Sequence, residues 1–359
     1  MKKFLAVTLA TAMTLSLVAC GSSSSETAAP AAPETTAAET TAAETEKAEV
    51  TGDMPEVTLK LGFSTNEEDP RALAAKQFAD EVAEKTGGAV TVELYPSGQL
   101  GGDADLINSI SLDSGTVDII ITDASNFATY EPKMGISALP FQFEDFETAW
   151  AFMDSDIEAE AEAGLLEQNM RVLAHYCNGF RCVTNSKGAV ESPDDMKGML
   201  IRTPENPVIM ATMTALGANP QPLSFSELYQ ALQQGTYDAQ ENPIPVIYNN
   251  NLYEVQKYLS VTNHIYSGMC FTIAESSWQK MSAEEQAIVQ EAATASADYD
   301  RELNKQQTTD LVASLKEAGM EINEPDLAPF AEATASVLTD NAETYGDLLD
   351  KLAEWKKAN

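Results

Sequence analysis

Apolar and polar positions in the middle of the chain repeat as two successive copies of one pattern. In the first copy, residues 57–63 alternate apolar and polar side chains as a half-buried strand does, and a helical spacing follows over 70–86. Proline begins this helix and the pair Gly87-Gly88 ends it, as helix termini prefer. The pattern then predicts a strand at 89–95, a helix at 103–114 and a strand at 117–122.

The second copy runs in the same order. It predicts strands at 198–202, 220–223 and 237–240, with helices at 208–216 and 226–234 between them. The junction Ser114-Gly-Thr-Val-Asp118 in the first copy resembles Gln234-Gly-Thr-Tyr-Asp238 in the second. Alternating strands and helices imply parallel strands joined by right-handed crossovers. We therefore predict an α/β protein with two lobes, each an open, mostly parallel sheet flanked by helices.

A long helix is predicted after the second copy. Ser282 and Glu285 have the spacing of a capping box, and apolar residues then recur at three- and four-residue steps until Gly319. A helix of this length exceeds the usual dimension of one lobe, so we expect it to lie across both. The remaining tail predicts further helices.

The beginning of the chain has the pattern of an export signal. Lys2 and Lys3 precede an apolar run over 4–18, and the run ends in Leu-Val-Ala-Cys20. Residues 1–20 therefore predict a lipoprotein signal peptide with Cys20 as the lipidated residue, although an ordinary cleaved signal with a chance cysteine is the alternative. Residues 21–54 are mostly Ser, Thr, Ala, Pro and Glu, which predicts a disordered tether to the outer face of the cell membrane.

The formal net charge of −35 argues against two classes of binding partner. Nucleic acids and anionic membrane surfaces would be repelled. An anionic small molecule is still compatible with this charge, because salt screens distant carboxylates. No Gly-x-Ser-x-Gly elbow and no phosphate-binding Walker loop occurs in the sequence, so we expect a binding protein and not an enzyme.

Cysteines and histidines give no metal or cofactor signal. His175 and His264 lie far apart, with no cysteine or carboxylate at ligand spacing, and we predict neither a metal nor a cofactor. Cys177 and Cys182 would face opposite sides of one extended strand, so a disulfide between them requires a turn at Asn178. The sequence therefore neither predicts nor excludes this disulfide.

Two arginines and several small polar residues are the candidate ligand contacts. Arg181 follows Asn-Gly-Phe, and Arg202 lies within the apolar run Met-Leu-Ile. A buried guanidinium is costly unless something pairs with it, and its planar donors match a carboxylate. The alternative for each is an ion pair with an acid of the same chain. Ligand contacts of open α/β sheets lie on loops after the strands, where the chain carries Ser64, Thr65, Asp123, Asn126, Phe225 and Asn242.

Several motifs resemble those of one family in content and in order. They are YPSGQLGG, ALPFQF, NGFR, MKGMLIR, LGANPQP, FSELYQALQQG, QENP and YEVQKYL, between residues 95 and 259. Together they resemble the DctP family, the solute-binding proteins of TRAP transporters. The resemblance implies a two-lobed fold, similar to type II periplasmic binding proteins, with crossing strands and a shared helix. It implies that the lobes close around a carboxylate and deliver it to membrane permease subunits. We expect the protein to be a monomer.

The resemblance also assigns roles to residues. It implies that Arg202 clamps the carboxylate and that Arg181 assists, with a hydrogen bond from Asn242 and a packing face from Phe225. Asp123 matches an acidic cleft position of the sialic-acid branch, although it could instead cap the turn that follows it. The lobes are expected to comprise residues 55–178 with 268–307, and 179–267 with 308–359.

Two departures from the sialic-acid branch bear on the ligand. Ser64 stands where that branch has asparagine, and Asn126 where it has arginine, which puts sialic acid itself in doubt. Asp123 suits hydroxyl donors and would repel a second carboxylate, so a sugar acid such as a uronate or aldonate is favoured over a C4-dicarboxylate. A co-receptor that presents its ligand to a sensor kinase would use the same cleft and is the alternative role.

Overall fold

Within residues 56–359, which this computed structural model describes, the strands form one nine-stranded sheet in the order β2-β1-β3-β8-β4-β7-β5-β6, with β9 beside β8. The predicted signal peptide, its Cys20 and the whole predicted tether lie outside the described residues. None of the helices in the described part is long and apolar enough to cross a membrane.

Lobe I contains the first predicted copy. Its elements are β1 (Val57–Gly62), α1 (Pro70–Lys85), β2 (Val90–Tyr95), α2 (Asp103–Ser111) and β3 (Ile119–Asp123). Strand β1 pairs in parallel with both β2 and β3, as predicted. Strand β3 has a run of isoleucines because both faces of this sheet are covered. Ile119 and Ile121 pack on the side of α1, whereas Ile120 packs on the side of α2.

Lobe II contains the second copy. Its elements are β5 (Leu200–Thr203), α5 (Pro207–Ala215), β6 (Asn219–Pro222), α6 (Phe225–Gln233) and β7 (Ala239–Pro243). Strand β5 pairs in parallel with β6 and β7. The repeated order of elements predicted from the sequence is therefore confirmed. The short helix α7 (Ile244–Asn249) follows β7.

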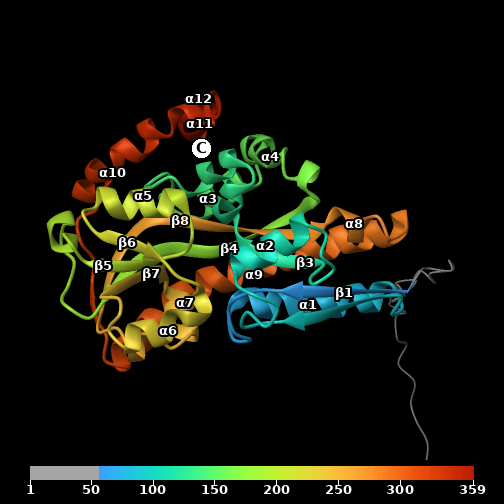
Figure 1. The fold of residues 1–359 in the computed structure, drawn as a ribbon, viewed down its shortest axis with the longest axis horizontal. Coiled ribbons are helices and arrows are strands. Elements are labelled where there is room, and N and C mark those ends of the chain that lie inside the picture. The colour runs from blue at the N-terminus through green and yellow to red at the C-terminus, as the bar shows by residue number, and fades with distance from the viewer. Residues whose placement is uncertain (1–55) are drawn as a thin grey trace, which may run out of the picture. The chain divides into compact units, whose positions relative to one another are not determined.

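Two long strands join the lobes. They are β4 (Met170–Asn185) and β8 (Tyr258–Ala274), which pair with each other in antiparallel fashion. Strand β8 also pairs with β3 of lobe I, and β4 pairs with β7 of lobe II. Figure 1 shows β4 and β8 running between the part with β1 and β3 and the part with β5, β6 and β7. The sheet is therefore continuous through both lobes.

The remaining elements cover these sheets. Helix α9 (Ala283–Glu317) begins with the predicted capping box at Ser282 and packs against α1, β4 and α7, so it spans both lobes. The other helices and the last strand are α3 (Phe146–Met153), α4 (Asp156–Glu162), α8 (Glu275–Trp278), β9 (Glu321–Asn323), α10 (Ala328–Asp340), α11 (Ala342–Tyr345) and α12 (Leu348–Ala358). Short 3-10 turns are η1 (Ala124–Thr129), η2 (Pro132–Ala138), η3 (Leu166–Gln168), η4 (Pro193–Met196) and η5 (Leu252–Glu254).

The end of the chain departs from the predicted lobe assignment. Helix α10 packs against α5 of lobe II, but α11 packs against η2 and α12 against α4. The ring of Trp355 lies 6.5 Å from that of Phe143 and 5.7 Å from that of Phe152, both on the lobe I side. Residues 308–359 therefore do not belong to lobe II alone, because the tail crosses back to bury its apolar face.

The described cysteines are all free and buried. Cys177, Cys182 and Cys270 form no disulfide. Strand β4 continues through Asn178 without the turn that a bond between Cys177 and Cys182 requires. Burial raises the pKa of each thiol to about 12, so the thiolate form is disfavoured.

We predict that Gly268→Ala destabilises the protein. Gly268 lies in β8, and a Cβ atom there would meet Sδ of Met153 at 2.7 Å. Overpacking of this kind costs about 1–3 kcal/mol. Gly188→Ala is the control, because a Cβ there meets nothing within 4 Å. Urea unfolding should show a loss for Gly268→Ala and none for Gly188→Ala; equal stability of the two variants would contradict the prediction.

Candidate functional site

All of the predicted ligand residues meet at one small cavity between the lobes. We call this cavity of about 40 Å³ the inner cavity. Its lining comprises Ser64, Thr65, Arg71, Asp103, Asp123, Asn126, Asn178, Arg181, Arg202, Pro204, Phe225, Asn242 and Val246. The loops after β1, β3 and β5 open toward the same gap, and side chains of strands β4, β5 and β7 complete the lining. Which of them contact a ligand stays a prediction.

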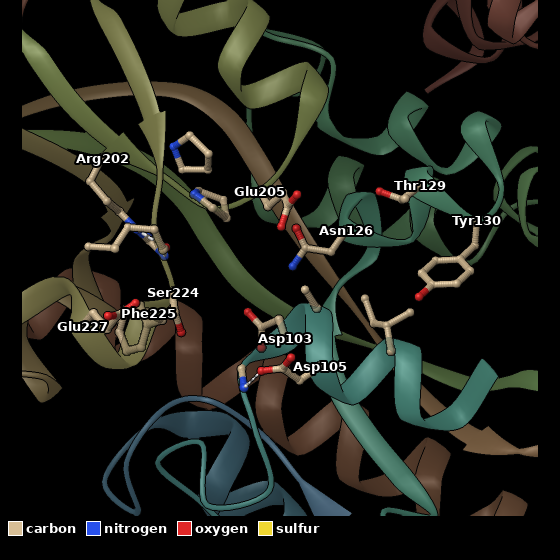
Figure 2. Close-up of a pocket in the computed structure, with 16 residues that line it drawn as sticks. Asp103, Asp105, Asn126, Thr129, Tyr130, Arg202, Glu205, Ser224, Phe225 and Glu227 are labelled. Carbon is tan, nitrogen blue, oxygen red and sulfur yellow. Dashed lines mark hydrogen bonds between the residues drawn. The ribbon is translucent and has the colours of Figure 1, made fainter. Parts of the chain in front are cut away.

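A larger cavity of about 610 Å³ adjoins the inner one, and we call it the outer cleft. The two share Asp103, Asn126, Arg202, Pro204 and Phe225. Figure 2 shows Arg202, Ser224 and Phe225 on one side of the outer cleft and Asp103, Asn126 and Tyr130 on the other. The volume of the outer cleft is within the range usual for small-molecule sites, about 300–1,000 Å³.

Arg202 is held by the backbone and not by an acid. Its Nε and NH2 donate to the carbonyl oxygen of Leu223 at 2.9 and 2.6 Å, and its Cζ lies 5.8 Å from the centre of the Phe225 ring. The residue is only 3% exposed, and desolvation lowers the pKa of the guanidinium to about 10. It remains charged at neutral pH.

Arg202 is the exception among the arginines of the described chain, which otherwise form ion pairs with acids. The pairs are Arg71 with Asp69, Arg171 with Glu275, Arg181 with Glu241 and Arg301 with Asp154. No carboxylate of the described residues lies within 4.0 Å of the Arg202 guanidinium nitrogens. A buried cation without an anionic partner is costly, so this arrangement needs a reason outside the fold.

Arg181 follows the alternative that the sequence left open. Its Nε donates to Glu241, and its NH2 donates to Oε1 of the same carboxylate at 2.8 Å. Desolvation opposes ionisation of Glu241, but the charge of Arg181 outweighs it and holds the pKa of Glu241 below its usual value. The internal ion pair considered for Arg181 is therefore present, and its contact with a ligand stays a prediction. Its NH1 atom lies 3.3 Å from Ser267 Oγ and 4.0 Å from Asp123 Oδ2.

Asp123 and Asn242 are also engaged within the chain. Oδ1 of Asp123 accepts from the backbone N–H of Ser125 at 3.0 Å and so caps η1, the capping role considered above. Its Oδ2 accepts from the hydroxyl of Ser267. The amide of Asn242 accepts from NH2 of Arg181 at 3.2 Å and donates to Gln240 at 2.6 Å. Both side chains line the inner cavity with hydrogen bonds already in place.

Two polar atoms at the cavity have no partner. Oγ1 of Thr65 and Oδ1 of Asp103 are buried and make no hydrogen bond within the described residues. Desolvation raises the pKa of Asp103, against the opposing charge of Arg71 and then the Ser64 hydroxyl. Burying such atoms costs free energy unless a ligand supplies a hydrogen-bond partner.

Sequence reasoning missed Asp103, Arg71 and Asn178. Asp103 begins α2 directly after the loop that follows β2, so the rule that selected Ser64 could have found it. Arg71 lies in the first turn of α1, where its Nε donates to Asp69 at 3.0 Å and its NH2 to Asn178 at 2.7 Å. The sequence gave no sign that Arg71 on α1 and Asn178 on β4 point to the gap.

The lobes touch each other across the gap. Asn206, the N-cap of α5, donates to Ser125 Oγ of lobe I at 2.5 Å, and Asn66 of lobe I donates to the carbonyl of Asn249 at 2.6 Å. A Cβ atom at Gly102 would lie 3.0 Å from Oγ of Ser224. The structure therefore represents a closed arrangement of the lobes.

A two-lobed α/β fold that closes on a small polar cavity with one unpaired cation defines a solute-binding protein. The chain belongs to the DctP family, described as bacterial extracellular solute-binding protein, family 7, whose model matches residues 61–344. The resemblance seen in the sequence is thus confirmed.

Known relatives cover nearly the same span. The 2,3-diketo-L-gulonate-binding periplasmic protein YiaO of Escherichia coli (strain K12) is 34% identical over 291 residues, which are 81% of this chain and 88% of that one. A TRAP periplasmic solute-binding protein of Roseobacter denitrificans with bound L-galactonate has a TM-score of 0.78 at 34% identity, covering 83% of this chain and 99% of that one. Another, from Sulfurospirillum deleyianum with bound succinate, has a TM-score of 0.79 at 29% identity, covering 84% and 99%.

We predict that Thr65→Val stabilises the ligand-free protein. The substitution keeps the side-chain shape and removes a buried hydroxyl that has no partner, so we expect a gain of about 1 kcal/mol. Thr122→Val is the matched control: the hydroxyl of Thr122 is buried and accepts from Asn126 at 3.1 Å, so its loss should destabilise. If urea unfolding shows the two variants losing stability alike, Thr65 has a partner in solution.

Proposed function

We propose that this solute-binding protein captures a small carboxylate, and specifically a sugar acid such as an aldonate or uronate, for a TRAP permease. The observation that carries the proposal is the unpaired guanidinium of Arg202 at the wall shared by the inner cavity and the outer cleft. A ligand carboxylate would supply the anion that no described residue supplies, and it can accept two parallel hydrogen bonds from a guanidinium. The role is binding and release, without catalysis.

The groups facing Arg202 favour hydroxyls over a second carboxylate. Thr65, Asn126, Asp103 and Asp123 belong to lobe I and line the inner cavity. The hydroxyl and amide can donate or accept, while the carboxylates accept from hydroxyl groups. A second carboxylate beside Asp103 and Asp123 would be repelled. The relatives that bind 2,3-diketo-L-gulonate and L-galactonate support this ligand class, whereas the succinate-binding relative represents the competing one.

Closure would couple recognition to transport. Arg202 lies on lobe II and Thr65 on lobe I, so one ligand contacts both only when the lobes are shut. The contacts of Asn206 with Ser125 and of Asn66 with Asn249 would then add to the stability of the closed state. The permease would receive its solute from this closed form.

We also propose that the protein works outside the cytoplasmic membrane as a lipid-anchored monomer. The apolar run that ends in Leu-Val-Ala-Cys20 and the polar segment 21–54 support an anchor followed by a tether. Membership in an extracellular solute-binding family supports the location.

The experiment is a calorimetric screen of full-length protein against matched pairs of acid and neutral sugar. Galactonate, galacturonate, gulonate and glucuronate are compared with galactose and glucose, and with succinate and sialic acid. We expect binding of at least one aldonate or uronate, and none of the neutral sugars. A neutral sugar as the tightest ligand would refute the role of Arg202, and succinate as the tightest would refute the sugar-acid assignment.

Arg202→Ala should abolish tight binding without unfolding the protein. Removing the guanidinium leaves the ligand carboxylate buried without a partner, so we expect the Kd to rise at least about 100-fold. The ligand-free melting temperature should not fall, because the substitution removes an unpaired buried cation. Arg171→Ala is the control, since it deletes the same charge from a partly exposed pair with Glu275 away from the cavity. An unchanged Kd for Arg202→Ala in calorimetry would count against the proposal.

A further inference from the structure

We propose that Asp300 and Asn304 of α9 are positioning residues that hold the hinge between the lobes and thereby set how readily the lobes close. The inference rests on the proposed function, because it explains how the ligand site is brought to its closed form. Neither side chain lines the inner cavity or the outer cleft. Their effect on the ligand is therefore exerted through the strands that join the lobes.

The hinge of this proposal is one of three bulges or irregularities that interrupt the ladder of β4 with β8. In the ladder with β8, Cys177 pairs with Gly268 and Gly179 pairs with Ser267, so Asn178 is an extra residue that has no partner in β8. We call residues 177–179 the hinge bulge. A bulge interrupts the ladder and bends the strand. Gly179 has a φ of +113°, a conformation that side chains disfavour and glycine permits.

Helix α9 holds the peptide groups of this bulge from one side. Oδ2 of Asp300 accepts from the backbone N–H of Cys177 at 2.6 Å, and Nδ2 of Asn304 donates to the carbonyl of the same residue at 2.8 Å. The two side chains are four residues apart and so lie on one face of α9. Both residues are buried, and a Cβ atom at Gly179 would lie only 3.0 Å from Oδ1 of Asn304. The helix and the hinge bulge thus fit each other closely.

Each of these side chains keeps one atom unused in the closed arrangement. Oδ1 of Asp300 and Oδ1 of Asn304 are buried without a hydrogen-bond partner in the described residues. Burial raises the pKa of Asp300 well above its usual value. Burying polar atoms without partners costs free energy, so these two side chains are not in the arrangement that would stabilise the fold most. Each has an unused oxygen beside the bend, which could accept a hydrogen bond when the lobes move.

The other side of the hinge bulge is tied to the ligand cavity. Oδ1 of Asn178 accepts from NH2 of Arg71 at 2.7 Å, and its Nδ2 donates to Oγ of Ser267 at 3.0 Å. Ser267 in turn donates to Asp123. Arg71, Asn178 and Asp123 all line the inner cavity. The bulge therefore lies between the ligand site and α9, with direct hydrogen bonds to both.

Helix α9 is attached to each lobe by a side-chain hydrogen bond, so it bridges the lobes at the hinge. Arg301 donates from NH1 to Asp154 at 2.6 Å on the side of lobe I. On the side of lobe II, Asn249 of α7 donates to Gln307 at 2.9 Å. Along the helix, Asn304 lies between these two attachments and Asp300 lies directly before the first.

The test compares Asp300→Leu and Asn304→Leu with Asp300→Asn in the full-length protein. Leucine removes the polar contact with Cys177, whereas Asn at 300 keeps an oxygen that can accept from its N–H. Asp310→Leu is the control, because Asp310 is an exposed acid of the same helix. For each variant we would measure the Kd of the tightest sugar acid, the melting temperature, and the radius of gyration by small-angle X-ray scattering with and without ligand.

We expect Asp300→Leu and Asn304→Leu to raise the Kd about tenfold, within the range of coupling between distant sites, and to change the ligand-free radius of gyration. Asp300→Asn and Asp310→Leu should stay within about twofold of the parent Kd. A lower melting temperature with an unchanged Kd and an unchanged radius of gyration would show a purely structural role and overturn the inference.

The outcomes separate this inference from the proposed function. If the parent protein binds no sugar acid, the proposed function fails, and the scattering of the ligand-free variants still decides the role of the hinge residues. If the parent binds and both leucine variants behave like it, only the inference fails.

Discussion

The guanidinium of Arg202 is the constraint around which the site is arranged. This side chain lies one residue before the end of strand β5 and is buried at the wall of the inner cavity, where a single carbonyl, that of Leu223, accepts two of its hydrogen bonds. A carbonyl orients the guanidinium but does not neutralise it, and its charge is left for a ligand to balance. A protein carboxylate at this place would stabilise the fold and abolish the site. Under the proposed function, a bound ligand carboxylate would remove this cost.

The continuous sheet explains how that cost can be tolerated. Strands β4 and β8 each contribute to both lobes, so the two halves share hydrogen-bond ladders and do not depend on the cavity for their association. Helix α9 and the returning tail add apolar burial across the same boundary. The facing surfaces of the lobes can therefore carry unpaired polar atoms, such as those of Thr65 and Asp103.

The repeated strands and helices of both lobes, and the cavity position of Arg202, could be predicted from the sequence because they follow from local periodicity and from the rule for strand ends. The pairing of Arg181 could not. Its partner Glu241 is adjacent only because β4 and β7 are antiparallel, with Arg181 opposite Pro243, and this register is a tertiary property. Arg71 was missed for a similar reason: it points toward the cavity from a helix, and its place at the cavity is also a tertiary property. The crossing tail was missed because helical periodicity does not say which lobe a helix covers.

The count of charges at the inner cavity argues for one carboxylate per ligand. Arg71 is balanced by Asp69 and Arg181 by Glu241, so each of these pairs adds little net charge. Among the described residues, Arg202 is then the cavity arginine that no carboxylate contacts, but Asp103 and Asp123 also line the inner cavity, so the lining has no excess of positive charge. Distant surface acids are screened over about 8 Å at physiological salt, so these nearby charges matter most. One ligand carboxylate could pair with Arg202, whereas a second would lie close to Asp103 and Asp123 and be repelled.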